Sequence, residues 1–317
     1  MYTVGVDIGG QTSKIGIVDA NGSILTRTII RTDSYGTDAD AFVGALRDAV
    51  LSCVHDAGVD FGGVCGLGIG APNANYYNGC IEYAANIAWA ADGIVPIASK
   101  LSSVLGGVRV RLTNDANAAA MGEMRYGVAR GMRDFIMITL GTGVGSGIVV
   151  DGKIVYGHDG NAGELGHIIV EPGGRLCGCG RRGCLETYCS ATGVARTAKE
   201  WLEETDEPSM LRGTSVLNSK TVYDAATCGD AMALRILEYT GKMLGRSLAN
   251  FVAFSAPEAI VLFGGLTKAR EFFYEPMVKA LDDNVMPIWK GKVAVLFSTL
   301  KESDAAILGA SALALDE

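Results

Sequence analysis

One arrangement of short strands and glycine turns occurs twice in the sequence. The first copy predicts three strands around Gly9 and Gly22, at residues 4–8, 14–18 and 24–30. The second copy predicts three strands around Gly143 and Gly152, at residues 135–140, 145–150 and 153–156. Because self-similarity of this kind marks a repeated structural unit, the sequence predicts a duplicated α/β fold.

Each copy is followed by alternating helical and strand-like segments. After the first, the apolar spacing predicts helices at 39–57 and 115–126 and strands at 64–69 and 108–112. After the second, it predicts helices at 190–204, 230–254, 268–281 and 303–315 and strands at 259–263 and 293–297. We therefore expect a small N-terminal α/β domain (1–118), on which a C-terminal helix (303–317) packs, and a larger α/β domain (119–302).

Composition excludes several classes of function. The charge is 27 basic minus 35 acidic residues, or −8, which gives no basic excess for nucleic acid or an anionic membrane. No segment reaches the roughly 18 apolar residues of a membrane span. The chain begins with a strand pattern and not with a basic, apolar leader, so we expect a cytoplasmic protein. Its 43 glycines indicate many tight turns and close backbone approaches.

The two glycine turns have the composition of phosphate-binding loops. The first combines Asp7, Gly9, Gly10 and Thr12, and the second covers Gly141, Thr142 and Gly143, in the range 141–147. Backbone N–H groups without a nearby Cβ can close on phosphoryl oxygens, and a carboxylate can hold hydrated Mg²⁺. Glycine pairs in hairpin turns also serve geometry alone. Two such turns in duplicated halves favour a nucleotide held between two domains.

A histidine and three cysteines have the spacing of a zinc site. Cys177, Cys179 and Cys184 lie in a Gly/Arg loop with no apolar pattern, ten residues and more after His167. Three thiolates and one imidazole complete a tetrahedral zinc site, which is structural because no coordination position stays open. Cys189 is an alternative fourth ligand. The scattered cysteines are interpreted as small buried hydrophobes, namely Cys53, Cys65, Cys80 and Cys228.

Asn114 and Asp115 stand where a strand ends and an alanine-rich helix begins. Either side chain could simply cap the helix. Glu164, His167 and Glu186 place further carboxylates and an imidazole on the loops that a zinc site would draw together. The sequence thus predicts one polar site built from several loops.

These segments together resemble the ROK family of bacterial sugar kinases and sugar-responsive repressors. The matching segments are 7–10, 114–123, 140–147, 163–167 and 177–186, and the CxCGxxGCxExxxS pattern of the last one, completed by Ser190, is specific to that family. The resemblance implies the actin-like ATPase fold of hexokinases, in which two RNase H-like domains enclose a cleft for ATP, with Mg²⁺, and a hexose.

The resemblance also implies a role for each matching residue. Asp115 would be the general base for the sugar 6-hydroxyl. The residues that would bind the sugar are Asn86, Asn114, Asp115, Glu164, His167 and Glu186. Those that would contact ATP are Asp7, Gly9, Gly10, Thr12, Gly141, Thr142, Gly143, Gly264 and Gly265. The ligands of a structural Zn²⁺ would be His167, Cys177, Cys179 and Cys184.

The chain departs from the family pattern in its first turn and in its sugar loop. Gln11 stands where the family usually has threonine, so either Gln11 or Thr12 meets the phosphates. Asn73 replaces a glycine of the family's sugar loop, and Asn86 belongs to a segment similar to the family's Asn-Leu-x-x-Trp.

We therefore predict an ATP-dependent hexose kinase, acting on glucose, that assembles as a homodimer. Kinases for N-acetylglucosamine, N-acetylmannosamine, fructose, mannose or allose share the motif set and stay open as alternatives. A sugar-sensing repressor would need a helix-turn-helix before the first strand, which begins at residue 3. A non-catalytic sugar-binding protein is the third possibility.

Overall fold

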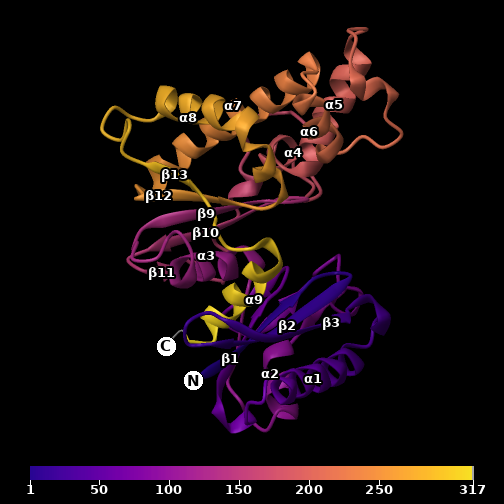
Figure 1. Cartoon of the computed structure of the whole chain (residues 1–317), viewed down its shortest axis with the longest axis vertical. Helices are drawn as coiled ribbons and strands as arrows, with labels where there is room; N and C mark the ends of the chain where they lie inside the picture. Colours follow the sequence, from indigo (N-terminus) through magenta and orange to yellow (C-terminus); the bar gives the residue numbers. More distant parts are fainter. Residues whose placement is uncertain (316–317) are drawn as a thin grey trace.

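Two five-stranded sheets with the same strand order form the framework of the chain. A computed structural model describes residues 1–315. The sheets have the orders β3-β2-β1-β4-β8 and β11-β10-β9-β12-β13, in which three antiparallel strands are followed by two parallel ones. Figure 1 shows the two sheets one above the other, with α3 and α9 between them. The predicted duplication is confirmed.

The first half of the chain contains the first sheet and two covering helices. Its strands are β1 (Tyr2–Ile8), β2 (Thr12–Asp19), β3 (Ile24–Arg31), β4 (Val64–Gly70) and β8 (Val110–Thr113). The helices are α1 (Ala39–Asp56) and α2 (Ile97–Val104), of which the sequence predicted only the first. A small sheet of β5 (Ala74–Asn75), β6 (Cys80–Glu82) and β7 (Ile94–Val95) was also missed, because its strands are too short to show an alternating pattern.

The second half repeats this plan with more helices. Its strands are β9 (Phe135–Leu140), β10 (Val144–Val150), β11 (Lys153–Ile154), β12 (Ala259–Phe263) and β13 (Ala294–Phe297). Its helices are α4 (Glu186–Cys189), α5 (Ala191–Glu204), α6 (Ser219–Thr227), α7 (Ala231–Ser255) and α8 (Arg270–Asn284). The longest, α7, packs along α8 and shares one hydrophobic core with β9 and β12.

Two helices join the halves. Helix α3 (Asp115–Tyr126) follows β8, and α9 (Glu302–Leu313) returns from the second half and packs against β1, β4 and α3. The approach is unusually close, because a methyl group at Gly68 on β4 would overlap the carbonyl oxygen of Ala310 on α9. Glycine is therefore required where α9 crosses the first sheet.

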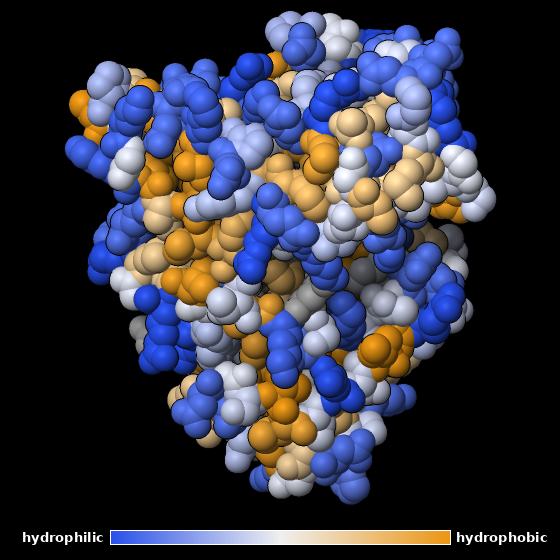
Figure 2. Space-filling model, turned by 45° about the horizontal axis from the view of Figure 1, so that its top comes forward, coloured by the Kyte–Doolittle hydropathy of each residue, from blue (hydrophilic) through white to orange (hydrophobic). Residues whose placement is uncertain are grey.

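The strands are apolar because helices cover the sheets. Val4, Val6, Ile136 and Ile138 are fully buried, as the near-continuous hydrophobic runs of central strands require. Hydrophilic residues cover most of the face drawn in Figure 2, with apolar residues in smaller patches between them. Within residues 1–315, every helix is too short or too polar to cross a bilayer.

The interpretation of the scattered cysteines is half wrong. Cys53 and Cys80 are buried as expected, but Cys65 and Cys228 are exposed. Cys65 occupies an outward-facing position of β4, and Cys228 follows the last turn of α6, where the chain leaves the core. Single cysteines in mixed surroundings give too little pattern to predict burial.

The contact between α9 and the first sheet predicts a large difference between two glycine substitutions. Gly68→Ala should destabilise the fold by about 1–3 kcal/mol, the range for overpacking, because the α9 backbone must move. Gly44→Ala is the matched control: it lies in α1 with open space around it and should stabilise by about 0.5–1 kcal/mol. Urea unfolding measures both, and equal stability of the two variants would contradict the packing described.

Candidate active site

The ends of three parallel strands bring the first acidic residues together. Asp7 on β1 is in register with Gly70 on β4, which in turn is in register with Thr113 on β8. Asn114 then caps α3 by accepting a hydrogen bond from the N–H of Ala116 at 2.8 Å. Asp115 is the first residue of α3 and lies at this edge of the sheet.

The pKa of the Asp115 carboxyl group lies well above the ordinary range of an aspartate. Solvent reaches it, but protein on both sides of the cleft displaces most of the surrounding water. This loss of solvation, followed by the negative charge of Asp7 and, more weakly, that of Glu164, raises the pKa of Asp115 to about 6. The N–H of Ala116 donates to Asp115 Oδ1 at 2.8 Å and acts in the opposite direction.

A polar cavity of about 370 Å³ opens beside Asn114, between the two halves. It contains three of the residues predicted to bind sugar, namely Asn114, Glu164 and His167. Most of the other lining side chains are polar as well; they are Asn73, Glu82, Tyr83, Asn117, Ser146 and Asn161, with Ala74, Gly160 and Ala162. A lining of this kind suits a ligand with many hydroxyl groups.

Tight contacts with β10 fix Glu164 and His167. The hydroxyl of Ser146 on β10 donates to the carbonyl of Gly163 and accepts from the N–H of Leu165 at 3.0 Å. A methyl group at Gly166 would overlap the carbonyl oxygen of Val144, so the turn that presents His167 lies directly on the strand. These contacts therefore fix the backbone of the turn from which both side chains project.

Asn117, which was not among the predicted site residues, also lines the cavity. Asn117 is 3% exposed, and its Oδ1 has no hydrogen-bond partner. A buried hydrogen-bond acceptor without a partner destabilises the protein, and a ligand that donates a hydrogen bond to Asn117 Oδ1 would remove this destabilisation. An asparagine within an alanine-rich helix was the available signal.

The departure at Asn73 has a geometric reason. Its φ of 50° lies in the left-handed region, which asparagine tolerates better than most residues. Its side-chain amide also donates to the carbonyls of Glu82 and Tyr83, at 3.0 and 3.1 Å. Asn73 therefore adopts the glycine-like backbone and also fastens the small sheet that forms one cavity wall.

The histidine and three thiols expected to bind zinc meet in one cluster. The ligand atoms of His167, Cys177, Cys179 and Cys184 all lie within 4.8 Å of one another. His167 Nδ1 is 3.6 Å from Cys177 Sγ, and Cys179 Sγ is 3.6 Å from Cys184 Sγ. A tetrahedron with Zn–S distances of ~2.3 Å has edges of about 3.8 Å, so the donor set and its spacing fit zinc.

Cys189 is not part of this cluster. Its side chain is fully buried in the core of the second half, where Sγ lies 3.6 Å from the carbonyl of Thr240. Of the two alternatives for the fourth ligand, the structure places His167 beside the three thiols.

Glu186 connects the cluster to the second glycine turn. Its Oε2 accepts from the N–H of Val144 at 3.1 Å, and its Oε1 lies 3.6 Å from Cys177 Sγ. It lines a separate cavity of about 200 Å³ with Thr187 and Thr192. The structure therefore places Glu186 at the turn, outside the cavity that contains Glu164 and His167.

The first glycine turn lies against the segment that contains Asn86. A methyl group at Gly10 would overlap the carbonyl oxygen of Asn86, so the two backbones are in contact. Asn86 itself lies outside the 370 Å³ cavity. In the turn, the N–H of Gly9 donates to the carbonyl of Thr12 at 3.0 Å, and Gln11 is exposed between them.

The remaining predicted ATP contacts gather at the edge of the second sheet. Gly264 has a φ of 106° and lies beside the backbone of Leu140, the residue before the turn at 141–143. Gly265 begins the short 3-10 helix that follows. The N–H of Ala191 at the start of α5 donates to the carbonyl of Gly141 at 2.8 Å and holds the turn in place.

Comparisons with known proteins identify the family of the chain. The model of the ROK family matches residues 3–317. The chain is 37% identical over 315 residues to a glucokinase of Halalkalibacterium halodurans, covering 97% of this chain and 93% of the relative. It is 29% identical over 322 residues to an N-acetylmannosamine kinase of Salmonella arizonae, covering 99% and 98%.

A solved structure is also similar over its whole length. A ROK family glucokinase from Streptomyces griseus, in complex with glucose and AMPPNP, is 34% identical, with a TM-score of 0.79 and 99% of both chains covered. The chain belongs to the ROK family and has its actin-like ATPase fold, with two RNase H-like domains.

The charges around Asp115 make its titration testable. In Asp7→Asn the pKa of Asp115 should fall from about 6 toward its ordinary range, because a negative charge that disfavours ionisation is removed. Carboxyl ¹³C NMR titration of the ligand-free protein measures this, with Asp48→Asn on the exposed face of α1 as the control. An unchanged pKa in Asp7→Asn would contradict the coupling.

Proposed function

We propose that the chain transfers the γ-phosphoryl group of ATP to the 6-hydroxyl of glucose, with Asp115 as general base. The observation that carries the proposal is the position of Asp115. Its carboxylate lies next to a polar cavity that suits a sugar and close to Asp7 of the first turn. Gly145, beside the second turn, lies against Ala116 on the other side.

The enzyme class is that of the ATP-dependent sugar kinases. The relatives include glucokinases and N-acetylmannosamine kinases, and the similar Streptomyces griseus enzyme was solved with the ATP analogue AMPPNP. In this chain the turns at 9–12 and 141–143, with Gly264 and Gly265, would receive the nucleotide. Asp7 would hold the hydrated Mg²⁺ that neutralises charge on the phosphates.

The geometry of Asp115 suggests how it acts. The N–H of Ala116 holds Oδ1, so Oδ2 is free to accept the proton of the sugar hydroxyl. The deprotonating hydroxyl oxygen attacks the γ-phosphorus as the bond to the leaving ADP oxygen breaks in line. Because the pKa of Asp115 is about 6, the acquired proton passes to solvent readily at neutral pH.

Two observations favour glucose over an N-acetylhexosamine. Identity to the glucokinase of Halalkalibacterium halodurans is 37%, against 29% to the N-acetylmannosamine kinase of Salmonella arizonae. The cavity lining is largely polar and offers few apolar contacts for an acetamido methyl group. An N-acetylhexosamine is the second candidate substrate. The homodimer and the cytoplasmic location stay predictions from the sequence.

We further propose that the cluster at His167 binds one structural Zn²⁺. When bound, the ion supplies cross-links within the 177–184 loop and no open position for chemistry. His167 Nδ1 faces the thiols, which leaves Nε2 for the cavity. Cys177 also contacts Glu186, so the same loop orients a residue at the second turn.

The reaction itself is tested by ADP release in the presence of ATP, Mg²⁺ and individual sugars. Glucose should give the highest kcat/KM, with N-acetylmannosamine and N-acetylglucosamine clearly lower. Sugar-independent ATP hydrolysis alone, or no turnover with any hexose or N-acetylhexosamine, would overturn the proposal.

The Asp115→Asn substitution distinguishes a side chain that acts as a general base from one that only caps helix α3. The amide preserves the shape and cannot accept the proton, so kcat should fall about 10²–10⁴-fold with sugar affinity nearly unchanged. Glu164→Gln is the comparison variant and should raise KM more than it lowers kcat, because Glu164 lines the cavity. General-base catalysis contributes at least about 10²-fold to the rate. An Asp115→Asn enzyme that keeps more than about a tenth of the wild-type kcat would therefore contradict the base role.

Loss of zinc should affect stability and sugar binding together. Cys179→Ser, or chelation, should lower the melting temperature and raise KM for the sugar, because the loop that orients His167 and Glu186 is released. Cys228→Ser, exposed and outside the cluster, is the control and should change neither. Elemental analysis should find about one zinc per chain. Metal-free protein with full activity and stability would refute the site.

A further inference from the structure

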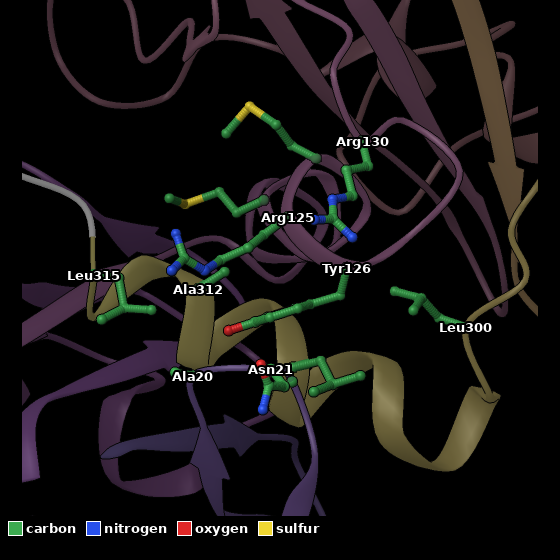
Figure 3. A pocket seen from close by; sticks show the side chains of 12 residues that line it. Ala20, Asn21, Arg125, Tyr126, Arg130, Leu300, Ala312 and Leu315 are labelled. Atoms are coloured by element: carbon green, nitrogen blue, oxygen red, sulfur yellow. The ribbon is translucent and has the colours of Figure 1, made fainter. Parts of the chain in front are cut away.

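We infer that the chain has a second binding site, at the hinge between its halves, for a phosphate monoester with an apolar body. The site is a pocket of about 990 Å³ on the connections between the halves, separate from the cavity beside Asp115. It lies between the turn at 20–22, the C-terminal part of α3 and helix α9. Figure 3 shows Arg125 and Tyr126 extending between α3 and α9.

The charge of this pocket is opposite to that of the protein. The chain has a net charge of −8, yet among residues 1–315 those that line the pocket include Arg125 and Arg130 and no carboxylate. Within the described part of the chain, neither guanidinium has an ion-pair or side-chain hydrogen-bond partner, although Arg125 lies 5.8 Å from the ring centre of Tyr126. The hydroxyl of Tyr126 is buried and also lacks a partner. Both guanidinium groups are exposed to solvent, so a ligand in this pocket can reach two cationic groups and one buried hydroxyl that lacks a partner.

The remaining lining indicates an amphipathic ligand. Apolar side chains form a large part of the pocket wall; they are Met121, Met124, Leu300, Leu308 and Leu315. A phosphate monoester has a charge of about −1.5 to −2 at neutral pH, which matches two guanidinium groups. An inorganic phosphate ion would leave the apolar wall unused, whereas a monoester with an apolar body would cover it.

The pocket is built on the two segments that connect the halves. The buried carboxylate of Glu123 on α3 accepts from the N–H of Val128 at 2.9 Å and from the hydroxyl of Ser298. Val128 belongs to the connection that leads to β9 and contributes Arg130. Ser298 belongs to the return connection, where its hydroxyl accepts from the N–H of Leu300 at 3.1 Å. A ligand between Arg130 and Leu300 therefore contacts both connections close to their common anchor.

This position makes the pocket an effector site. A ligand that binds one relative arrangement of the halves better than another shifts the equilibrium between them. Such a shift must change the affinity of the active-site cleft, and cleft ligands must change effector affinity by the same factor. Binding of a nucleotide analogue is the suitable readout, because it does not depend on which sugar the enzyme uses.

Calorimetric titration of the full chain with phenyl phosphate tests the site. The protein is first saturated with AMPPNP and Mg²⁺ to block the phosphate turns. Phenyl phosphate should bind, and Arg125→Gln/Arg130→Gln should weaken binding about tenfold or more, as expected for lost charge-assisted bonds. The control Arg133→Gln, on the same connection but outside the pocket and paired with Asp151, should bind as wild type. Equal affinity of wild type and double variant, or no binding by wild type, would overturn the site.

The effector role requires a second measurement. The dissociation constant of AMPPNP should change when phenyl phosphate is present, and this change should vanish in the double variant but persist in Arg133→Gln. Inorganic phosphate supplies only the charged group and phenol only the apolar group. Each alone should therefore change the dissociation constant of AMPPNP little. An AMPPNP affinity that is insensitive to bound phenyl phosphate would overturn the effector role.

Discussion

Close packing of α3 determines where the chemistry can occur. Gly70 of the first sheet, Gly147 of the second sheet and Gly309 of α9 all approach this helix so closely that a methyl group would be in or near overlap. The alanines of α3 supply the matching flat surface. A helix enclosed on three sides cannot rotate, so Asp115 at its first position has a fixed place between the two sheets. This packing accounts for part of the high glycine content.

The two halves of the chain contribute different parts of the site. Loss of solvation raises the pKa of Asp115 to about 6, and the negative charge of Asp7, which the first half contributes, adds to this shift. The second half contributes Glu164 and His167, which tight backbone contacts with β10 hold at the cavity. The cysteine loop reaches the same region through His167 and Glu186. Residues distant in sequence therefore depend on one another for their orientation.

Much of this could be predicted from the sequence because the decisive signals are local. The duplicated strands, the glycine turns and the start of α3 at Asp115 all follow from spacing within a few residues. The cysteine cluster is similarly local, apart from the choice between His167 and Cys189, which depended on the fold.

The rest depends on contacts between distant segments. The burial of the Asn117 acceptor, the place of Glu186 at the glycine turn and the anchoring of both connections by Glu123 arise only when sheets and helices pack. The hinge pocket likewise combines segments around residues 21, 125 and 312. Hydrophobic periodicity describes short stretches of sequence, so it does not predict which distant segments will meet.

We propose that the cavity beside Asp115 directs phosphoryl transfer to the 6-hydroxyl of glucose. Proton-coupled ³¹P NMR of the reaction with glucose, ATP and Mg²⁺ tests this claim most directly, because the splitting counts the hydrogens on the phosphorylated carbon. A triplet, from phosphate on the one carbon that carries two hydrogens, is the predicted result. A doublet, from phosphate on a ring carbon, or inorganic phosphate as the only new product besides ADP, would contradict the claim.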